Sequence, residues 1–395
     1  MSIPVMNRDR KEPNSLGELA KLFLRLGVLG FGGPAAHIAM MEDEVVKRRG
    51  WLSHDHFLDL LGVTNLIPGP NSTEMAIHIG LVRNGWRGLV VAGICFIIPA
   101  IAITLLLAWL YVSYGSLPQA VPLIVGMRPA IIAIILGAVY RLGRPLFKKG
   151  PVPPVIGLVV ACLAILRINE IALLFAGGVA AVLWSVRDRM GSFLLPVLAT
   201  GFAAPAAVQA AGFSAAPEGV SASALGLFFL KIGSVLYGSG YVLVAFLQGG
   251  LVESRHWLTQ TQLLDAIAVG QFTPGPVLST ATFIGYIILG LPGATVATAG
   301  IFLPSFVFVL LIGPFVPKLR TVPVLSAFLD GVNGAALGLI LAVCISLGAA
   351  TLVSPLLWFL FVAAGAAILI WRVHPGWLVI GSAVIGWAAA SIFHL

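Results

Sequence analysis

Two short stretches combine helix-breaking residues with polar side chains in a way that could bind an anion. Pro68-Gly69-Pro70 is followed directly by Asn71, Ser72 and Thr73, and residues 30–34 read Gly-Phe-Gly-Gly-Pro. Proline removes a backbone donor and glycine loosens the chain, so each stretch interrupts a helix and a new helix starts after it. A helix N-terminus offers unpaired N–H groups and partial positive charge, which suit an oxyanion. We expect the three polar residues after the second break to cap the new helix.

Both stretches occur a second time in the chain. Gly69 corresponds to Gly275, an offset of 275 − 69 = 206 residues, and Trp51 corresponds to Trp257 at the same offset. Beyond the Pro-Gly-Pro the offset becomes 290 − 85 = 205, which pairs Gly85 with Gly290. So many matches in two nearly ungapped frames indicate that the chain is a duplication.

One cation recurs near the first break of each half, at Arg25 and Lys231, inside apolar surroundings. Ionisable residues within a membrane segment usually have a function, although long side chains can also extend to an interface and only anchor a helix. Close helix packing is the alternative role for the glycine-rich breaks. The residues that we expect to contact the substrate are Arg25, Gly32, Gly33, Pro34, Gly69, Pro70, Asn71, Ser72, Thr73, Lys231, Gly238, Ser239, Gly275, Pro276, Ser279 and Thr280.

Glu74 follows the second break, and Thr280 takes its place in the other half. A carboxylate is costly inside a membrane, so Glu74 is a candidate proton relay. Stabilisation by the positive end of its helix is an equally good interpretation. The sequence contains no nucleophile–base pair, zinc motif or phosphate loop, and its three cysteines stand apart in apolar runs, so we expect no enzyme activity, cofactor or metal.

The composition is that of an integral membrane protein. Of 395 residues, 59% are hydrophobic and 10% are charged, and the mean hydropathy is +1.03. Soluble domains carry about a quarter charged residues. The net charge of +8 comes from Lys and Arg at the ends of apolar runs, which reflects membrane topology and does not indicate a nucleic-acid partner.

The apolar runs predict an all-α fold of roughly 13 membrane segments, some of them broken or re-entrant. We expect a cytoplasmic tail (1–15), an N-terminal repeat (16–150), connecting membrane helices (151–221) and a C-terminal repeat with two further helices (222–395). One crossing is expected at residues 193–213. The substrate and the lipid bilayer are the expected partners, and a homodimer is a further expectation.

Charged loops orient the two halves differently. Arg141, Arg144, Lys148 and Lys149 follow a crossing in the first half, whereas the equivalent turn of the second half, residues 348–354, has no charge. Because Lys and Arg collect on the cytoplasmic side, this pattern predicts an inverted-topology repeat and a cytoplasmic N-terminus.

The motifs at residues 30–34, 49–52 and 68–70, with a second copy ending in Pro274-Gly275-Pro276, resemble the chromate transporter family in its long two-domain form. The resemblance covers nearly the whole chain. It implies a plasma-membrane protein with oppositely oriented halves that expels chromate and confers resistance, driven by the membrane potential or a proton gradient. The second half departs from the motif at Tyr237, Ser239 and Gly240, which favours one asymmetric site.

The hypothesis is therefore a secondary anion transporter in which the breaks of both halves converge, with Arg25 and Lys231 supplying charge, and in which the halves rock against each other. Chromate and sulfate are both tetrahedral dianions, so the residues alone do not separate them. A sulfate or other oxyanion importer or exchanger, and a passive anion channel, are the alternatives.

Overall fold

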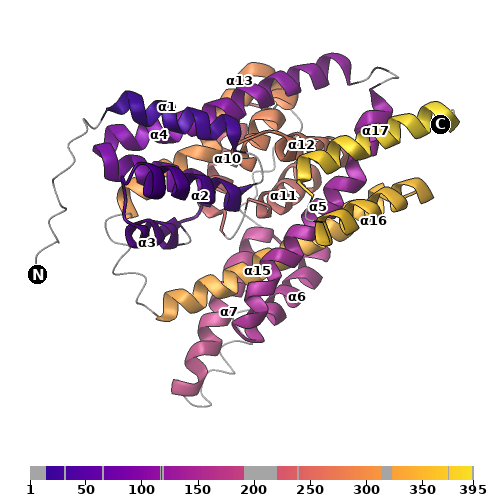
Figure 1. The fold of residues 1–395 in the computed structure, drawn as a ribbon. Coiled ribbons are helices and arrows are strands. Elements are labelled where there is room, and N and C mark those ends of the chain that lie inside the picture. Colours follow the sequence, from indigo (N-terminus) through magenta and orange to yellow (C-terminus); the bar gives the residue numbers. More distant parts are fainter. Residues whose placement is uncertain are drawn as a thin grey trace, which may run out of the picture.

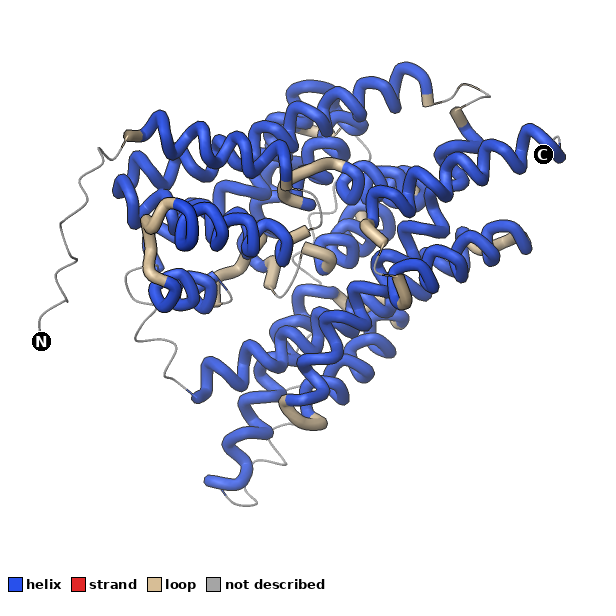
Figure 2. Tube along the Cα trace, viewed as in Figure 1, coloured by secondary structure: helices blue, strands red, loops and turns tan. Residues whose placement is uncertain are grey.

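The computed structural model describes residues 15–30, 33–64, 66–115, 117, 120–190, 220–237, 240–312, 323–371 and 373–393. Every regular element in these ranges is helical, in agreement with the all-α prediction (Figures 1 and 2). The crossing expected at residues 193–213 lies outside the described residues, as do the expected site residues Gly32, Gly238 and Ser239.

The helices form two groups, and the first group contains all the breaks. Its members in the first half are α1 (Leu16–Leu29), α2 (Pro34–Glu42), η1 (Asp43–Arg48), α3 (His54–Thr64) and α4 (Asn71–Tyr114). Its members in the second half are α10 (Ala222–Val235), α11 (Val242–Leu247), η4 (Gln248–Glu253), α12 (Gln260–Phe272), η5 (Val277–Ser279) and α13 (Thr280–Ile312). Within this group α1 packs on α4, α10 packs on α13, and α4 packs on α13.

Both predicted breaks of the first half are confirmed. The helix α1 ends at Leu29 and α2 begins at Pro34, which occupies the first helical position, where its missing N–H costs nothing. The second break separates α3 from α4, but the predicted caps are wrong: Pro70 is the N-cap, Asn71 is already helical, and no side chain caps the helix. The fixed φ of Pro70 sets the helix start without a polar cap.

A sharp bend divides both α4 and α13 into a short arm and a long arm. Non-helical angles occur at Asn84 (φ −135°, ψ 22°) and Gly85 (φ 60°, ψ −150°), and almost the same angles recur at Leu289 and Gly290. A Cβ built at Gly80 would lie 2.3 Å from the carbonyl oxygen of Gly88, so the arms pack closely where both residues are glycine. The short arms, residues 71–83 and 280–288, are the helices that the sequence predicts after each Pro-Gly-Pro break, and their re-entrant placement stays a prediction.

Six helices of the described ranges make up the second group: α5 (Val121–Lys148), α6 (Val152–Ile165), α7 (Glu170–Met190), α15 (Pro323–Thr351), α16 (Pro355–Leu369) and α17 (Pro375–Phe393). The helices α6 and α7 pack on α15, whereas α16 and α17 pack on α5, and α5 packs on α15. Two helices of the first half, α6 and α7, therefore pack on α15 of the second half, and two helices of the second half, α16 and α17, pack on α5 of the first half. In Figure 1 this group lies mostly to the lower right of the broken helices.

Five helices in the described residues are long and apolar enough to cross a membrane, judged by length and composition. They are residues 71–114, 121–148, 170–187, 277–311 and 323–351, and several shorter apolar helices of 10–17 residues accompany them. At 1.5 Å per residue, the 28 residues of α5 extend about 42 Å, which exceeds the hydrocarbon core of about 30 Å.

Candidate functional site

The breaks of the two halves are joined by a pair of equivalent backbone hydrogen bonds. The N–H of Gly69 donates to the carbonyl oxygen of Leu236 (2.8 Å), and the N–H of Gly275 donates to the carbonyl oxygen of Gly30 (2.7 Å). Gly275 is the repeat counterpart of Gly69, and Leu236 is that of Gly30, so the same contact is made twice with the halves exchanged. Each Pro-Gly-Pro break thus lies beside the first break of the other half.

A cavity of about 460 Å³ lies where these segments meet, and every break contributes to its wall. Gly33 and Pro34 come from the first break, Asn71 from the second, Gly240 from the third and Gly275 from the fourth. The cavity also reaches α5, so its wall contains both groups of helices. Its size falls in the range of small-ligand sites, about 300–1,000 Å³.

Arg141 of α5 brings positive charge to this cavity, and it is the one Lys or Arg among the described residues that line it. Its guanidinium lies within interaction range of the hydroxyl group of Tyr241, and that hydroxyl group donates a hydrogen bond to Oε1 of Gln271 (3.2 Å). Both partners also line the cavity. A guanidinium has five donors in a planar fork, which suits an oxyanion with several oxygens.

A second cavity, of about 530 Å³, adjoins the first and shares Asn71, Arg141 and Leu142 with it. Lys149 and Asp330 lie in its wall and pair with each other at 2.5 Å. Arg141 therefore lies between the two cavities. The larger cavity extends from it toward Lys149 and the end of α5.

The structure divides the predicted substrate residues into three sets. Gly33, Pro34, Asn71 and Gly275 line the smaller cavity. The second set lies in or directly after the breaks and away from the cavity walls. It consists of the break residues Gly69, Pro70 and Pro276 and of Ser72, Thr73, Ser279 and Thr280, which are buried in the helical turns that follow. Arg25 and Lys231 line neither cavity.

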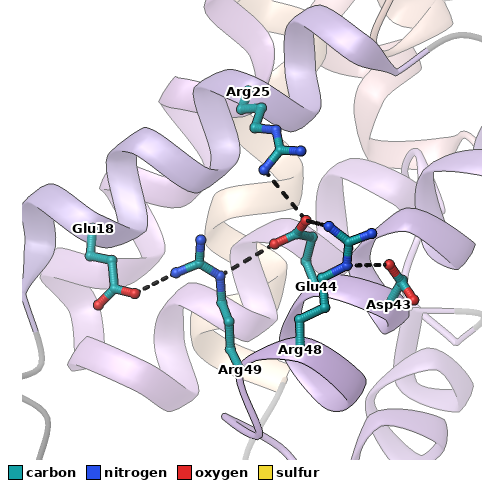
Figure 3. Close-up of polar contacts among 6 residues, drawn as sticks. All are labelled: Glu18, Arg25, Asp43, Glu44, Arg48 and Arg49. Atoms are coloured by element: carbon teal, nitrogen blue, oxygen red, sulfur yellow. Dashed lines mark hydrogen bonds and ion pairs between the residues drawn. The ribbon is translucent and has the colours of Figure 1, made fainter.

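Arg25 belongs instead to an ion-pair cluster that joins α1 to η1 (Figure 3). Its guanidinium lies 3.5 Å from Oε1 of Glu44, and its side chain is 55% exposed. Glu44 also accepts from Arg48 at 3.2 Å and from Arg49 at 3.4 Å, while Arg49 also pairs with Glu18. The Glu44 carboxylate is therefore buried among three guanidinium groups. The run of acidic and basic residues at 42–49 does not predict this burial.

Lys231, the counterpart of Arg25, is exposed and lies within electrostatic range of Glu170, at the start of α7. Glu170 packs closely on η4, because a Cβ built at Gly249 would lie 1.5 Å from its Oε1. The repeated cation therefore has an acidic partner from a different element in each half.

A buried ion pair between α5 and α12 also connects the two helix groups. Arg128 of α5 donates to both oxygens of Asp265 on α12, from Nε at 3.0 Å and from Nη2 at 3.1 Å. Tyr111 of α4 donates its hydroxyl to Asp265 Oδ2 at 2.9 Å. Asp265 is 3% exposed, so the pair is shielded from water and holds α5 against the broken helices.

Sequence reasoning missed Arg141 as a site residue because it stands first in a basic run that is typical of a cytoplasmic loop. The run is helical up to Lys148, and Arg141 lies two turns inside the helix end. The length of the apolar and basic run together, which exceeds a bilayer crossing, is the signal that could have separated Arg141 from the loop residues.

Comparisons with known proteins agree with the repeat and with a membrane protein. The sequence model of the family described as Chromate transporter matches residues 17–182 and 223–387, so the first match ends within α7 and the second within α17. The chain is 34% identical over 382 residues to the Chromate transport protein of Cupriavidus metallidurans, covering 96% of this chain and 94% of that protein. The chain is a multi-pass membrane protein.

Two other relatives have similar names. The Probable chromate transport protein of Synechococcus elongatus is 34% identical, covering 85% of both chains. The Chromate transport protein of Pseudomonas aeruginosa is 35% identical, covering 86% of this chain and 82% of that protein. No solved structure matches the chain.

Proposed function

Because the chain belongs to the chromate transporter family, we propose that it is a secondary transporter that exports chromate across the bacterial plasma membrane and so confers resistance. Three relatives named as chromate transport proteins, each at about a third identity over most of both chains, support this substrate. Catalytic chemistry has no part in this function.

The observation that carries the proposal is the cavity of about 460 Å³, which joins all four breaks to Arg141. The first residues of α2 and α4, Pro34 and Asn71, line this cavity, and helix N-termini carry unpaired N–H groups and partial positive charge. The guanidinium of Arg141 adds a full charge and a planar set of donors. These features suit a tetrahedral dianion better than a cation or an apolar molecule.

We assign to Arg141 the side-chain charge that attracts the dianion. Arg25 and Lys231 have acidic neighbours, Glu44 and Glu170, and line neither cavity, so in this conformation they act at the edge of the broken-helix group. The buried hydroxyls of Thr73 and Ser279 have no partner within the described part of the chain, which makes them candidate substrate contacts after a conformational change.

The reciprocal hydrogen bonds between the breaks support a two-fold relation between the halves, since exchanging the halves leaves the pattern unchanged, and we propose that this relation is an inverted-topology repeat. A pseudo-two-fold axis in the membrane plane, roughly 13 membrane segments and a cytoplasmic N-terminus complete this proposal. Basic residues such as Lys148 and Lys149 at the end of α5 would then face the cytoplasm. A homodimer stays a prediction.

Alternating access would then arise from movement of one helix group against the other. The cavity lies between the broken helices and α5, and each group contains helices of both halves. Rocking of the first half against the second would separate α4 from α13 and break the bonds between the breaks. We favour movement of the group that contains α5 and α15, because it leaves the packing of α4 on α13 and the hydrogen bonds between the breaks intact.

The alternatives are an importer or exchanger of sulfate or another oxyanion, and a passive anion channel. A direct test is uptake of radiolabelled chromate into liposomes that contain the purified protein. Saturable uptake, competed weakly by sulfate, would support chromate transport. Stronger competition by sulfate would reassign the substrate, and uptake that does not saturate would indicate a channel.

A further inference from the structure

Glu74 is a carboxyl group sealed inside the broken-helix group. Its exposed fraction is 0%, and neither carboxyl oxygen has a hydrogen-bond partner among the residues that the structure describes. The carboxyl group lies directly against the second break, because a Cβ built at Gly69 would lie 2.2 Å from its Oε1 and 2.5 Å from the hydroxyl oxygen of Ser305 on α13.

No cation among the described residues neutralises this group. The titratable side chains near it are Tyr237, which lies within electrostatic range in the loop after α10, and His78, one turn further along α4 and also buried. The helices α13 and η5, which pack beside this turn, contain no charged residue. Four other elements contact α4 and direct their charges elsewhere.

Those four elements are α1, α2, α3 and α12. Arg25 of α1 pairs with Glu44, Asp59 of α3 is exposed, and Asp265 of α12 pairs with Arg128. On α2, the histidine ring of His37 hydrogen-bonds the carbonyl oxygen of Gly30 (2.8 Å). An ionised carboxylate is strongly disfavoured in such surroundings unless a partner compensates it, so Glu74 holds a proton in this conformation.

The position of Glu74 connects its proton to the anion cavity. Asn71 lines both cavities and precedes Glu74 by three residues, or about 4.5 Å along the helix axis. A negative charge on Glu74 would repel a dianion beside Asn71 and Arg141, whereas the neutral acid would not. Binding of the anion and binding of a proton therefore favour each other.

We propose that Glu74 is the proton-binding group of the transporter and that one proton crosses with each oxyanion. The proton joins a Glu74 oxygen from water on the side where the anion enters, and it returns to water on the side where the anion leaves. A dianion and one proton together carry a net charge of −1, so an inside-negative potential still drives export. The repeat counterpart Thr280 bonds the carbonyl oxygen of Val277 (2.8 Å) and cannot titrate, which gives one proton per cycle.

This inference rests on the proposed function, and the test separates the two. Liposomes containing the wild-type protein and a trapped pH-sensitive dye are given an inward chromate gradient, at an alkaline pH at which chromate is fully deprotonated. Chromate uptake should acidify the lumen. The variant Glu74→Gln mimics the neutral acid. It should still take up chromate, whereas the acidification of the lumen should fall at least 10-fold. Glu170→Gln, at a half-buried carboxylate that lines neither cavity, should acidify the lumen like the wild type.

Absence of chromate movement in the wild type would contradict the proposed function itself. Chromate uptake without acidification, or acidification that persists in Glu74→Gln, would overturn the role of Glu74 alone. Should Glu74→Gln not fold, the wild type decides through a hydrophobic carbodiimide, which modifies protonated carboxyl groups. At an alkaline pH at which conformations that open Glu74 to water release its proton, chromate should increase modification of Glu74, and an unchanged or decreased yield would overturn the inference.

Discussion

The N–H of Gly69 donates to the carbonyl oxygen of Leu236, 167 residues away (236 − 69), at 2.8 Å. The repeat makes the same bond from Gly275 to Gly30, so the duplicated halves hold each other at their interrupted helices. The interruption that costs each half its helical hydrogen bonds is thereby compensated by the other half. Neither half has this compensation alone.

The first prediction concerns the backbone at Gly69. Its φ of 150° is rarely adopted by other residues, and an added Cβ would meet Glu74 and Ser305. We expect Gly69→Ala to lower the free energy of unfolding by about 1–3 kcal/mol and to reduce transport. Thermal unfolding in detergent checks this. The control Gly365→Ala, where a Cβ meets nothing within 4 Å in α16, should be neutral or stabilising by up to about 1 kcal/mol.

The second prediction concerns the charge at Arg141. A hydrogen bond to a charged group contributes about 1.5–3 kcal/mol, so Arg141→Gln should raise the concentration for half-maximal chromate uptake by about 10- to 100-fold. Initial uptake rates in proteoliposomes measure this. Arg144→Gln, three residues further along α5 and absent from both cavity walls, is the matched control. Equal losses in the two variants would show that Arg141 acts through general surface charge.

The third prediction concerns the ion pair between α5 and α12. Asp265→Asn leaves the Arg128 guanidinium without its carboxylate in a buried site, which should cost about 3–5 kcal/mol of stability. Replacing both partners, Asp265→Leu with Arg128→Met, should recover most of this loss, since an apolar pair leaves no buried charge. Unfolding curves of the single and double variants provide the measurement, and additive losses would contradict the pairing.

The fourth prediction concerns topology. Trp86 and Leu291 are repeat counterparts at the bends of α4 and α13, and they are 65% and 62% exposed. In an inverted repeat, single cysteines at these two positions lie on opposite membrane faces. A membrane-impermeant maleimide, applied after the three native cysteines are replaced, should label one of them in intact cells and the other in inside-out vesicles. Labelling of both from the same side would exclude the inverted arrangement.

The breaks were predictable from sequence because their cause is local. Proline at residues 34 and 70 and glycine at residue 69 restrict where a helix can begin, and they do so in any surroundings. The ion pairs were not predictable, since Glu44 becomes buried only when α1 packs beside η1, and Arg128 finds Asp265 across 137 residues.

Arg141 was misinterpreted for a related reason. The charge pattern of a loop predicts on which side of the membrane the whole loop lies. The site depends instead on which single residue of the basic run faces the other helix group. Tyr241, its neighbour, takes the place of Ala35 of the first half, just outside the motif at residues 30–34, so the comparison of motifs gave no sign of it. The structure places the Tyr241 side chain in the wall of the cavity.

Locating bound chromate tests the central claim most directly, since chromium scatters X-rays anomalously. Crystals of the protein grown with chromate should show one chromium peak inside the cavity lined by Gly33, Asn71, Arg141 and Gly275, with chromate oxygens about 3 Å from the Arg141 guanidinium. A peak beside Arg25 or Lys231, with the cavity between the breaks empty, would contradict the account.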